Sequence, residues 1–136
     1  MTRILLDTSA YAAFKRGHRD AAAVVQSATV IALTPVLGEL LGGFAAGARE
    51  QQNRADLAAF LSSPRVWVAP LDGVTAEHYA RIYSALRAAG TPIPTNDMWI
   101  AASALQHDLR LFTFDAHFRA IGGLVAGASV AELTVP

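Results

Sequence analysis

Short apolar runs alternate along this chain with longer segments whose apolar residues recur at helical spacing. No dipeptide typical of a tight hairpin turn joins two of these runs, so we do not expect neighbouring runs to pair as hairpins. Strands separated by helices form a parallel sheet with helices on both faces. We therefore predict an α/β fold, a three-layer α/β/α sandwich with a parallel sheet of roughly five strands. The expected strands are residues 4–6, 30–33, 66–69 and 109–112, with 124–125 and 129–133 as candidates for a marginal fifth.

Capping residues predict where several helices begin and end. Thr34 followed by Pro35 is a strong helix start, with the proline at the first helical position, and this helix should reach about residue 47. We expect Thr75 to cap a long helix that ends at Gly90. The remaining predicted helices are one through Tyr11 and Phe14, one at 20–26, one at 49–61, and one that begins near Asp97 and is capped by Thr95 or Asn96.

Composition and charge limit the functional classes. The 136 residues fit one domain, which we take as residues 1–136. Eleven basic and eleven acidic residues balance, so any nucleic-acid binding must come from a local patch. The mean hydropathy of +0.33 is high for a small domain and suggests that a partner or a second copy covers apolar surface. Cysteine is absent and the uncharged residues 21–38 are interrupted by polar ones, so we expect a cytoplasmic protein without a membrane span.

Two carboxylates occupy positions where apolar side chains are expected. Asp97 shares one helix face with Ile100 and Ala101, so it should point inward, near the positive end of the helix dipole. Glu39 is the only charged residue among positions 21–48, and its helix is apolar on every side. Such a helix is buried in the fold or in an interface. A carboxylate there is costly unless something neutralises it.

Two more acids follow predicted strands. Asp7 comes directly after the first strand, and Asp115 lies just beyond the fourth. Strand ends and the first turns of helices converge on one edge of a parallel sheet, so we expect these two acids to join Glu39 and Asp97 in one site. Carboxylates this close could not all ionise unless a divalent cation neutralised them. With no His or Cys expected beside them, oxygen donors favour Mg²⁺ or Mn²⁺ over zinc, and such a site can hydrolyse a phosphodiester.

Each acid also has a purely structural explanation. Asp7 and Asp97 could cap helices, and Asp115 could form an Asx turn. Glu39 is harder to explain this way, because buried carboxylates are rarely unpaired. His117 beside Asp115 invites a general-base role, but we assign it to the surface or to packing because a metal-activated water needs no histidine.

Other charged and aromatic residues give weaker indications. We interpret the basic segment 15–19 as a solvated turn rather than a phosphate-binding patch. Four aromatic residues are assigned to the core or to a dimer contact rather than to base stacking. They are Trp67, Tyr79, Tyr83 and Trp99.

Around the four acids, the chain resembles PIN-domain nucleases and, within them, the VapC-type toxins of bacterial toxin–antitoxin pairs. The matching segments are residues 5–9, 34–40, 94–102 and 111–118, in the family's order and across nearly the whole chain. The last segment, with its Thr-x-Asp and following Phe, is the most specific.

The resemblance implies a parallel α/β/α sandwich and a Mg²⁺- or Mn²⁺-dependent endoribonuclease. It also implies an RNA substrate, a homodimer, and a small cognate antitoxin that occludes the active site, often with an Arg, and carries a DNA-binding part. The catalytic and metal-binding residues carried over are Asp7, Glu39, Asp97 and Asp115, with Ser9 and Thr113 supporting them by hydrogen bonds.

Two other functional classes share parts of this pattern. A module that binds RNA or an antitoxin without cutting would not need a complete set of acids, so the four acids argue against it. A receiver-like phospho-acceptor would need paired acids after the first strand and a late Lys, whereas Asp7 stands alone and the only Lys is Lys15. The metal-dependent ribonuclease is therefore the leading hypothesis.

Overall fold

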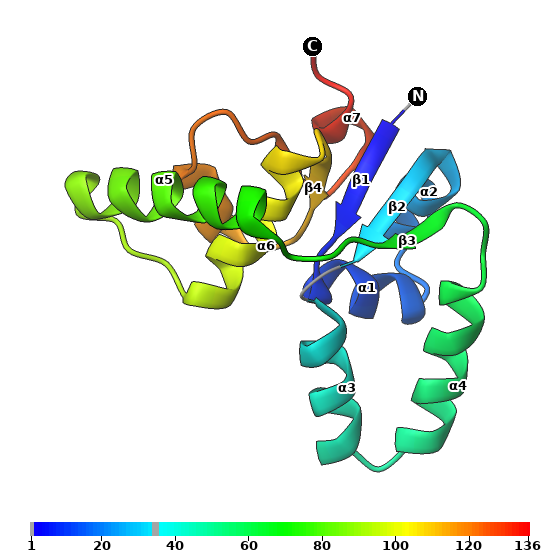
Figure 1. Ribbon diagram of the computed structural model, residues 1–136. Coiled ribbons are helices and arrows are strands. Elements are labelled where there is room, and N and C mark those ends of the chain that lie inside the picture. The colour runs from blue at the N-terminus through cyan, green and yellow to red at the C-terminus, as the bar shows by residue number, and fades with distance from the viewer. Residues whose placement is uncertain (1, 34–35) are drawn as a thin grey trace.

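The computed structural model describes residues 2–33 and 36–136. Across these residues the chain forms a sheet of five parallel strands in the order β3-β2-β1-β4-β5 (Figure 1). The predicted α/β class with a parallel sheet is confirmed. The strands are β1 (Thr2–Leu6), β2 (Ala28–Leu33), β3 (Val66–Val68), β4 (Arg110–Phe112) and β5 (Ala126–Gly127).

Helices connect the strands, in most cases where the sequence predicts them. No helix in the described part of the chain has both the length and the hydropathy of a transmembrane span. The helical segments are α1 (Thr8–Lys15), α2 (Arg19–Ser27), α3 (Val36–Ala46), α4 (Glu50–Leu61), α5 (Gly73–Ala89), α6 (Thr95–Gln106), the 3₁₀ helix η1 (Ala116–Ala120) and α7 (Val130–Leu133).

The helices cover both faces of the sheet. Successive side chains of a strand point to opposite faces, and Ile4, Leu5 and Leu6 of β1 are all 0% exposed. On one face of the sheet, α6 contacts β1 and β4. On the other face, α2 contacts β2. Right-handed crossovers place the helices between β1 and β3 on one face and those between β3 and β4 on the other. The core therefore has the two-sided burial of a three-layer sandwich.

The last part of the chain differs from the prediction. The fifth strand lies at residues 126–127, where Gly127 pairs with Phe112, rather than at 124–125. Residues 129–133, the other strand candidate, contain helix α7 instead. The Ser129 hydroxyl accepts a hydrogen bond from the Glu132 amide at 3.2 Å, and this serine cap starts a helix where the apolar residues alone suggested a strand.

The N-cap of α5 is Asp72, not the predicted Thr75. The Asp72 carboxylate accepts hydrogen bonds from the amides of Val74 and Thr75, at 3.0 and 3.1 Å. Thr75 occupies the third helical position and its hydroxyl accepts from the Asp72 amide, so the two residues form a capping box. The predicted end at Gly90 is confirmed, since this residue has the left-handed φ of 72° typical of a C-cap.

Helix α6 begins earlier than the prediction. Pro94 takes the N-cap position and makes no side-chain cap bond, while Thr95 and Asn96 already belong to the helix, so their assignment as caps is wrong. Asp97 still lies in the first turn. The predicted helix start at Thr34–Pro35 lies outside the described residues.

Helix α3 is less buried than its apolar sequence predicts. Only Val36 and Leu40 are buried, while Leu37, Leu41 and Phe44 are partly exposed. Figure 1 shows α3 and α4 projecting together from one end of the sheet. A single copy of the chain therefore leaves part of this apolar helix open to a partner.

The strand order places a topological switch point between β1 and β4. These strands are neighbours, but the chain runs from β1 to β2 on one side and from β4 to β5 on the other. In open parallel sheets, ligands bind at the carboxyl ends of the strands that flank such a point. Leu6 pairs with Phe112 at this end, so the next residues, Asp7 and Thr113, lie at the expected position for a site.

Gly127 provides a test of this packing. A Cβ added there would lie 2.5 Å from the Cβ of Glu132, so Gly127→Ala forces β5 and α7 apart. We expect a loss of about 1–3 kcal/mol in the free energy of unfolding, the usual cost of overpacking. Urea unfolding measures it. The matched control is Gly122→Ala, whose added Cβ meets no atom within 4 Å, and equal stability of the two variants would contradict the packing described.

Candidate metal centre

Asp7 is the buried acid at the end of β1. Its side chain is 6% exposed and caps α1, with Oδ1 accepting a hydrogen bond from the Thr8 amide at 2.7 Å. The predicted role of Asp7 as a helix cap is therefore correct, but capping involves only one of its two carboxylate oxygens, Oδ1. The other oxygen, Oδ2, accepts from the Thr113 hydroxyl at 2.6 Å and from the Ser9 hydroxyl at 3.3 Å.

Thr113 and Ser9 tie the ends of β1 and β4 together. The Thr113 hydroxyl also accepts from the Asp115 amide at 3.0 Å, and the Ser9 hydroxyl accepts from the Phe114 amide at 3.1 Å. Each hydroxyl thus donates to Asp7 and accepts from the segment after β4. Both residues make the kind of contacts expected of supporting residues, and this network orients Asp7 relative to Asp115.

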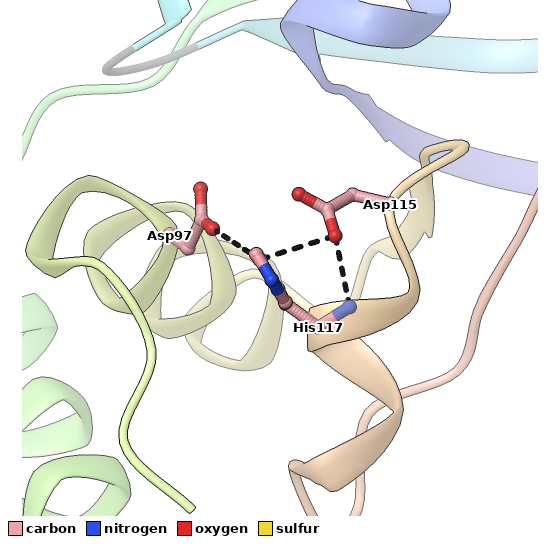
Figure 2. A group of neighbouring side chains, drawn as sticks. All are labelled: Asp97, Asp115 and His117. Carbon is pink, nitrogen blue, oxygen red and sulfur yellow. Dashed lines mark hydrogen bonds and ion pairs between the residues drawn. The ribbon is translucent and has the colours of Figure 1, made fainter.

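Asp97, Asp115 and His117 meet beside this network (Figure 2). One ligand atom from each lies within 4.8 Å of the others. His117 Nδ1 is 3.1 Å from Asp115 Oδ1 and 3.5 Å from Asp97 Oδ2. Asp97 comes from the first turn of α6, whereas Asp115 caps η1 by accepting from the His117 amide at 2.9 Å. The Asx turn considered for Asp115 therefore exists. The Asp115 carboxylate also lies near the Asp97 carboxylate.

Burial and neighbouring charge both act on Asp97. Burial raises the pKa of Asp97, and the negative charges of Asp7 and Asp115 raise it further. The hydrogen bond and charge of His117 act in the opposite direction without cancelling these effects. The Asp97 carboxylate is therefore costly to ionise in the absence of a cation.

Glu39 lies in the first turn of α3, near enough to Asp7 and Asp97 for their charges to act on it. Burial raises its pKa, the charge of Asp7 raises it next, and that of Asp97 adds a smaller increase, while the Thr8 hydroxyl opposes them. Its Oε1 atom is buried without a hydrogen-bond partner among the described residues. The charge interactions bring Glu39 into the same group as Asp7 and Asp97.

This donor set fits a divalent cation. Among the described residues, Asp97, Asp115 and His117 have ligand atoms within 4.8 Å of one another, whereas Asp7 and Glu39 lie outside this group and interact with its acids through charge. The pKa values of Glu39 and Asp97 are raised, and the buried Oε1 of Glu39 has no hydrogen-bond partner among the described residues. A divalent ion would remove the repulsion and supply the missing partner. The hard oxygen ligands suit Mg²⁺ or Mn²⁺.

His117 is the residue that the sequence analysis underestimated. Its side chain is 56% exposed, as the surface assignment predicts, yet its ring contacts two of the acids. The premise that no histidine lies beside the carboxylates is therefore wrong. The spacing of Asp115 and His117 within one turn was a usable signal, but the contact with Asp97 depends on tertiary structure.

The other residues weighed from the sequence have clear surroundings. Trp99 stacks on Tyr79 with ring centroids 4.3 Å apart, and Tyr79 stacks on Tyr83 at 6.4 Å. The Trp99–Tyr79 stack packs α6 against α5, in agreement with a packing role. Tyr83, also on α5, is 45% exposed, and Trp67 is 39% exposed, so neither belongs to the core. In the basic segment, Arg16 is exposed and lines, with Ser9 and Phe114, a depression of about 390 Å³ next to the acids.

Comparison with known proteins identifies relatives along nearly the whole chain. Residues 4–124 match the model of the PIN domain family. Ribonuclease VapC5 of Mycobacterium tuberculosis is 32% identical over 120 residues, which cover 88% of this chain and 87% of that protein. Two crystal structures are similar in fold. DNA-bound VapBC from Salmonella typhimurium has a TM-score of 0.82, 25% identity, and coverage of 93% of this chain and 98% of that one. VapBC-5 from Mycobacterium tuberculosis has a TM-score of 0.71, 27% identity, and coverage of 93% and 97%.

Replacing Thr113 tests the network that holds Asp7. Thr113→Val removes the donor to Asp7 and the acceptor for the Asp115 amide while keeping the shape of the side chain. We expect a loss of about 1–3 kcal/mol in the free energy of unfolding, because buried polar groups lose their partners. Urea unfolding in EDTA should also show that Thr113→Ser, which keeps the hydroxyl, loses less. A valine variant as stable as the serine variant would contradict this role.

The raised pKa of Glu39 gives a prediction for stability against pH. A carboxyl group whose pKa is raised by folding stabilises the native state below its ordinary pKa and loses that contribution as pH rises through the folded value. In EDTA, Glu39→Gln should therefore melt a few degrees above wild type at pH 8, and the difference should shrink as pH falls towards 4.5.

Thermal melts at several pH values measure this effect. Glu77→Gln, at an exposed position of α5, is the matched control and should follow the wild type. If Glu39→Gln were less stable than wild type at pH 8, this would contradict a Glu39 pKa that burial and neighbouring negative charges raise.

Proposed function

Because this chain belongs to the PIN-domain family and, within it, to the VapC ribonuclease toxins of type II toxin–antitoxin systems, we propose that it hydrolyses RNA phosphodiester bonds with Mg²⁺ or Mn²⁺ bound at its acidic site. The catalytic and metal-binding residues in this proposal are Asp7, Glu39, Asp97 and Asp115. The observation that supports it is the approach of Asp97, Asp115 and His117 within 4.8 Å, close enough to Asp7 and Glu39 that burial and carboxylate charges raise the pKa values of Asp97 and Glu39.

The protein groups have distinct tasks in this proposal. A divalent cation, when bound, polarises the phosphoryl oxygen and lowers the pKa of the attacking water. Asp97 and Asp115 face each other across a short gap and would hold the ion. Asp7 is fixed by hydrogen bonds from Thr8 and Thr113, so its free lone pairs keep one orientation towards the site.

Glu39 is suited to proton transfer as well as to metal binding. Burial and the charges of Asp7 and Asp97 raise its pKa, which brings this carboxylate closer to the range useful for a general base. Its buried Oε1 has no partner among the described residues, so this oxygen would be available to the ion or to a water that the ion holds.

The surface next to the acids supports an RNA substrate. Arg16 and Phe114 line the depression beside Ser9, and the neighbouring Lys15 and Arg19 are also exposed. In this proposal the cations bind backbone phosphates, which replaces the solvated turn that the sequence favoured, and the aromatic ring stacks on a base. Because the chain has a formal net charge of +0, this local patch rather than bulk charge would attract RNA.

We also propose that the chain pairs with a small cognate antitoxin and with a second copy of itself. The similar crystal structures are described as VapBC, and one as a toxin–antitoxin complex from Klebsiella pneumoniae. In this chain, the partly exposed apolar residues of α3 and the 45% exposed Tyr83 offer surface for such partners. A cytoplasmic location fits an RNA substrate and remains part of the proposal.

Substitution of Asp97 tests the activity. Asp97→Asn keeps the shape of the side chain and removes its charge, so RNA cleavage in Mg²⁺ or Mn²⁺ should fall at least by the roughly 10- to 100-fold that loss of an outer-shell partner costs a metal site. Cleavage of total bacterial RNA, followed on a denaturing gel, measures it. Glu77→Gln is the control and should cleave like wild type.

Chelation provides the second arm of this test. Excess EDTA should abolish cleavage by the wild type, and added Mg²⁺ or Mn²⁺ should restore it. Full activity of Asp97→Asn, or wild-type activity that persists in EDTA, would count against the proposal.

A further inference from the structure

His117 lies where a ligand of the cation would lie, although its residue type is not part of the acidic set. Its Nδ1 atom is 3.1 Å from Asp115 Oδ1 and 3.5 Å from Asp97 Oδ2, and Figure 2 shows the ring between the two carboxylates. The two acids come from α6 and from the cap of η1, so the imidazole joins two separate elements. Within the described residues, these three side chains are the group whose ligand atoms approach within 4.8 Å.

The backbone around His117 is fixed with respect to Asp115. The His117 amide donates to Asp115 Oδ1 at 2.9 Å, and the Asp115 amide donates to the Thr113 hydroxyl at 3.0 Å. The next residue, Phe118, is 0% exposed and anchors η1 in the core. Although the imidazole is 56% exposed, the backbone of His117 is therefore held beside the acids.

The spacing of His117 Nδ1 from one oxygen of each carboxylate matches the coordination of a small divalent ion. With metal–ligand bonds of about 2.1 Å in an octahedron, adjacent ligand atoms lie roughly 3.0 Å apart. The distances of 3.1 and 3.5 Å from Nδ1 to the two carboxylate oxygens are close to this edge length. An imidazole that merely packed on the surface would not need to face both oxygens.

We propose that His117 Nδ1 ligates the catalytic cation together with Asp97 and Asp115, and that this nitrogen ligand makes the site prefer Mn²⁺ to Mg²⁺. This inference rests on the proposed function, because it concerns the same metal site. Imidazole is a common ligand of transition metals, whereas Mg²⁺ binds mainly to carboxylate, carbonyl, phosphate and water oxygens. A ligand set of oxygens alone would distinguish the two ions less.

The competing explanation is that His117 is only an ion-pair partner of the two carboxylates and moves away when a cation binds. The two explanations differ in whether nitrogen contacts the bound ion. Electron spin-echo envelope modulation of the Mn²⁺-loaded protein detects such a nitrogen directly. We expect strong ¹⁴N modulation in the wild type and its loss in His117→Gln.

His107→Gln is the matched control, because His107 lies at the other end of α6 from Asp97 and packs against Trp67. This variant should keep the wild-type ¹⁴N modulation. Absence of that modulation from the Mn²⁺-loaded wild type, or its persistence in His117→Gln, would overturn the inference.

Isothermal titration with each ion separates this inference from the proposed function. Mn²⁺ affinity should fall by on the order of 10-fold in His117→Gln, with a smaller change for Mg²⁺. If wild type binds Mn²⁺, loses that binding in Asp97→Asn, and shows no preference over Mg²⁺, the role of His117 fails while the metal-dependent nuclease stands. If wild type binds neither ion, the proposed function fails as well.

Discussion

Repulsion among carboxylates gathered at one end of the sheet is the constraint on which the site depends. Burial and neighbouring charge raise the pKa values of Glu39 and Asp97, while hydrogen bonds from Thr8, Ser9 and Thr113 hold Asp7 in place. The protein therefore keeps acids close together at a cost to its own stability. A divalent cation bound among these acids would offset this repulsion.

The parallel sheet explains why acids so distant in the sequence can meet. Asp7 and Thr113 are separated by 106 residues, yet the pairing of Leu6 with Phe112 makes them neighbours. Because β1 and β4 lead to opposite sides of the sheet, no crossover connection covers the space at their carboxyl ends. Helix α6 then brings Asp97 to this space, and α3 brings Glu39.

The sequence predicted the features that depend on local pattern. The alternation of apolar runs with helices was sufficient to predict the parallel sheet. The acids that follow two of the strands were sufficient to suggest that they belong to one site. It failed where the outcome depends on tertiary contacts or on competing local signals. Residues 129–133 have the apolar content of a strand, but the Ser129 cap makes them helical. Asp72 and Thr75 are both good caps, and only the structure shows which position each takes. The contact of His117 with Asp97 joins α6 to η1, and neither segment reveals it alone.

The central claim is that these acids hold a divalent cation at the switch point between β1 and β4. Anomalous scattering from a crystal grown with Mn²⁺ locates the ion directly. We predict a strong peak within bonding distance, about 2.2 Å, of carboxylate oxygens of Asp97 and Asp115 and on the side of the site that Asp7 and Glu39 face. Manganese bound elsewhere, with no peak among these four acids at saturating concentration, would contradict it.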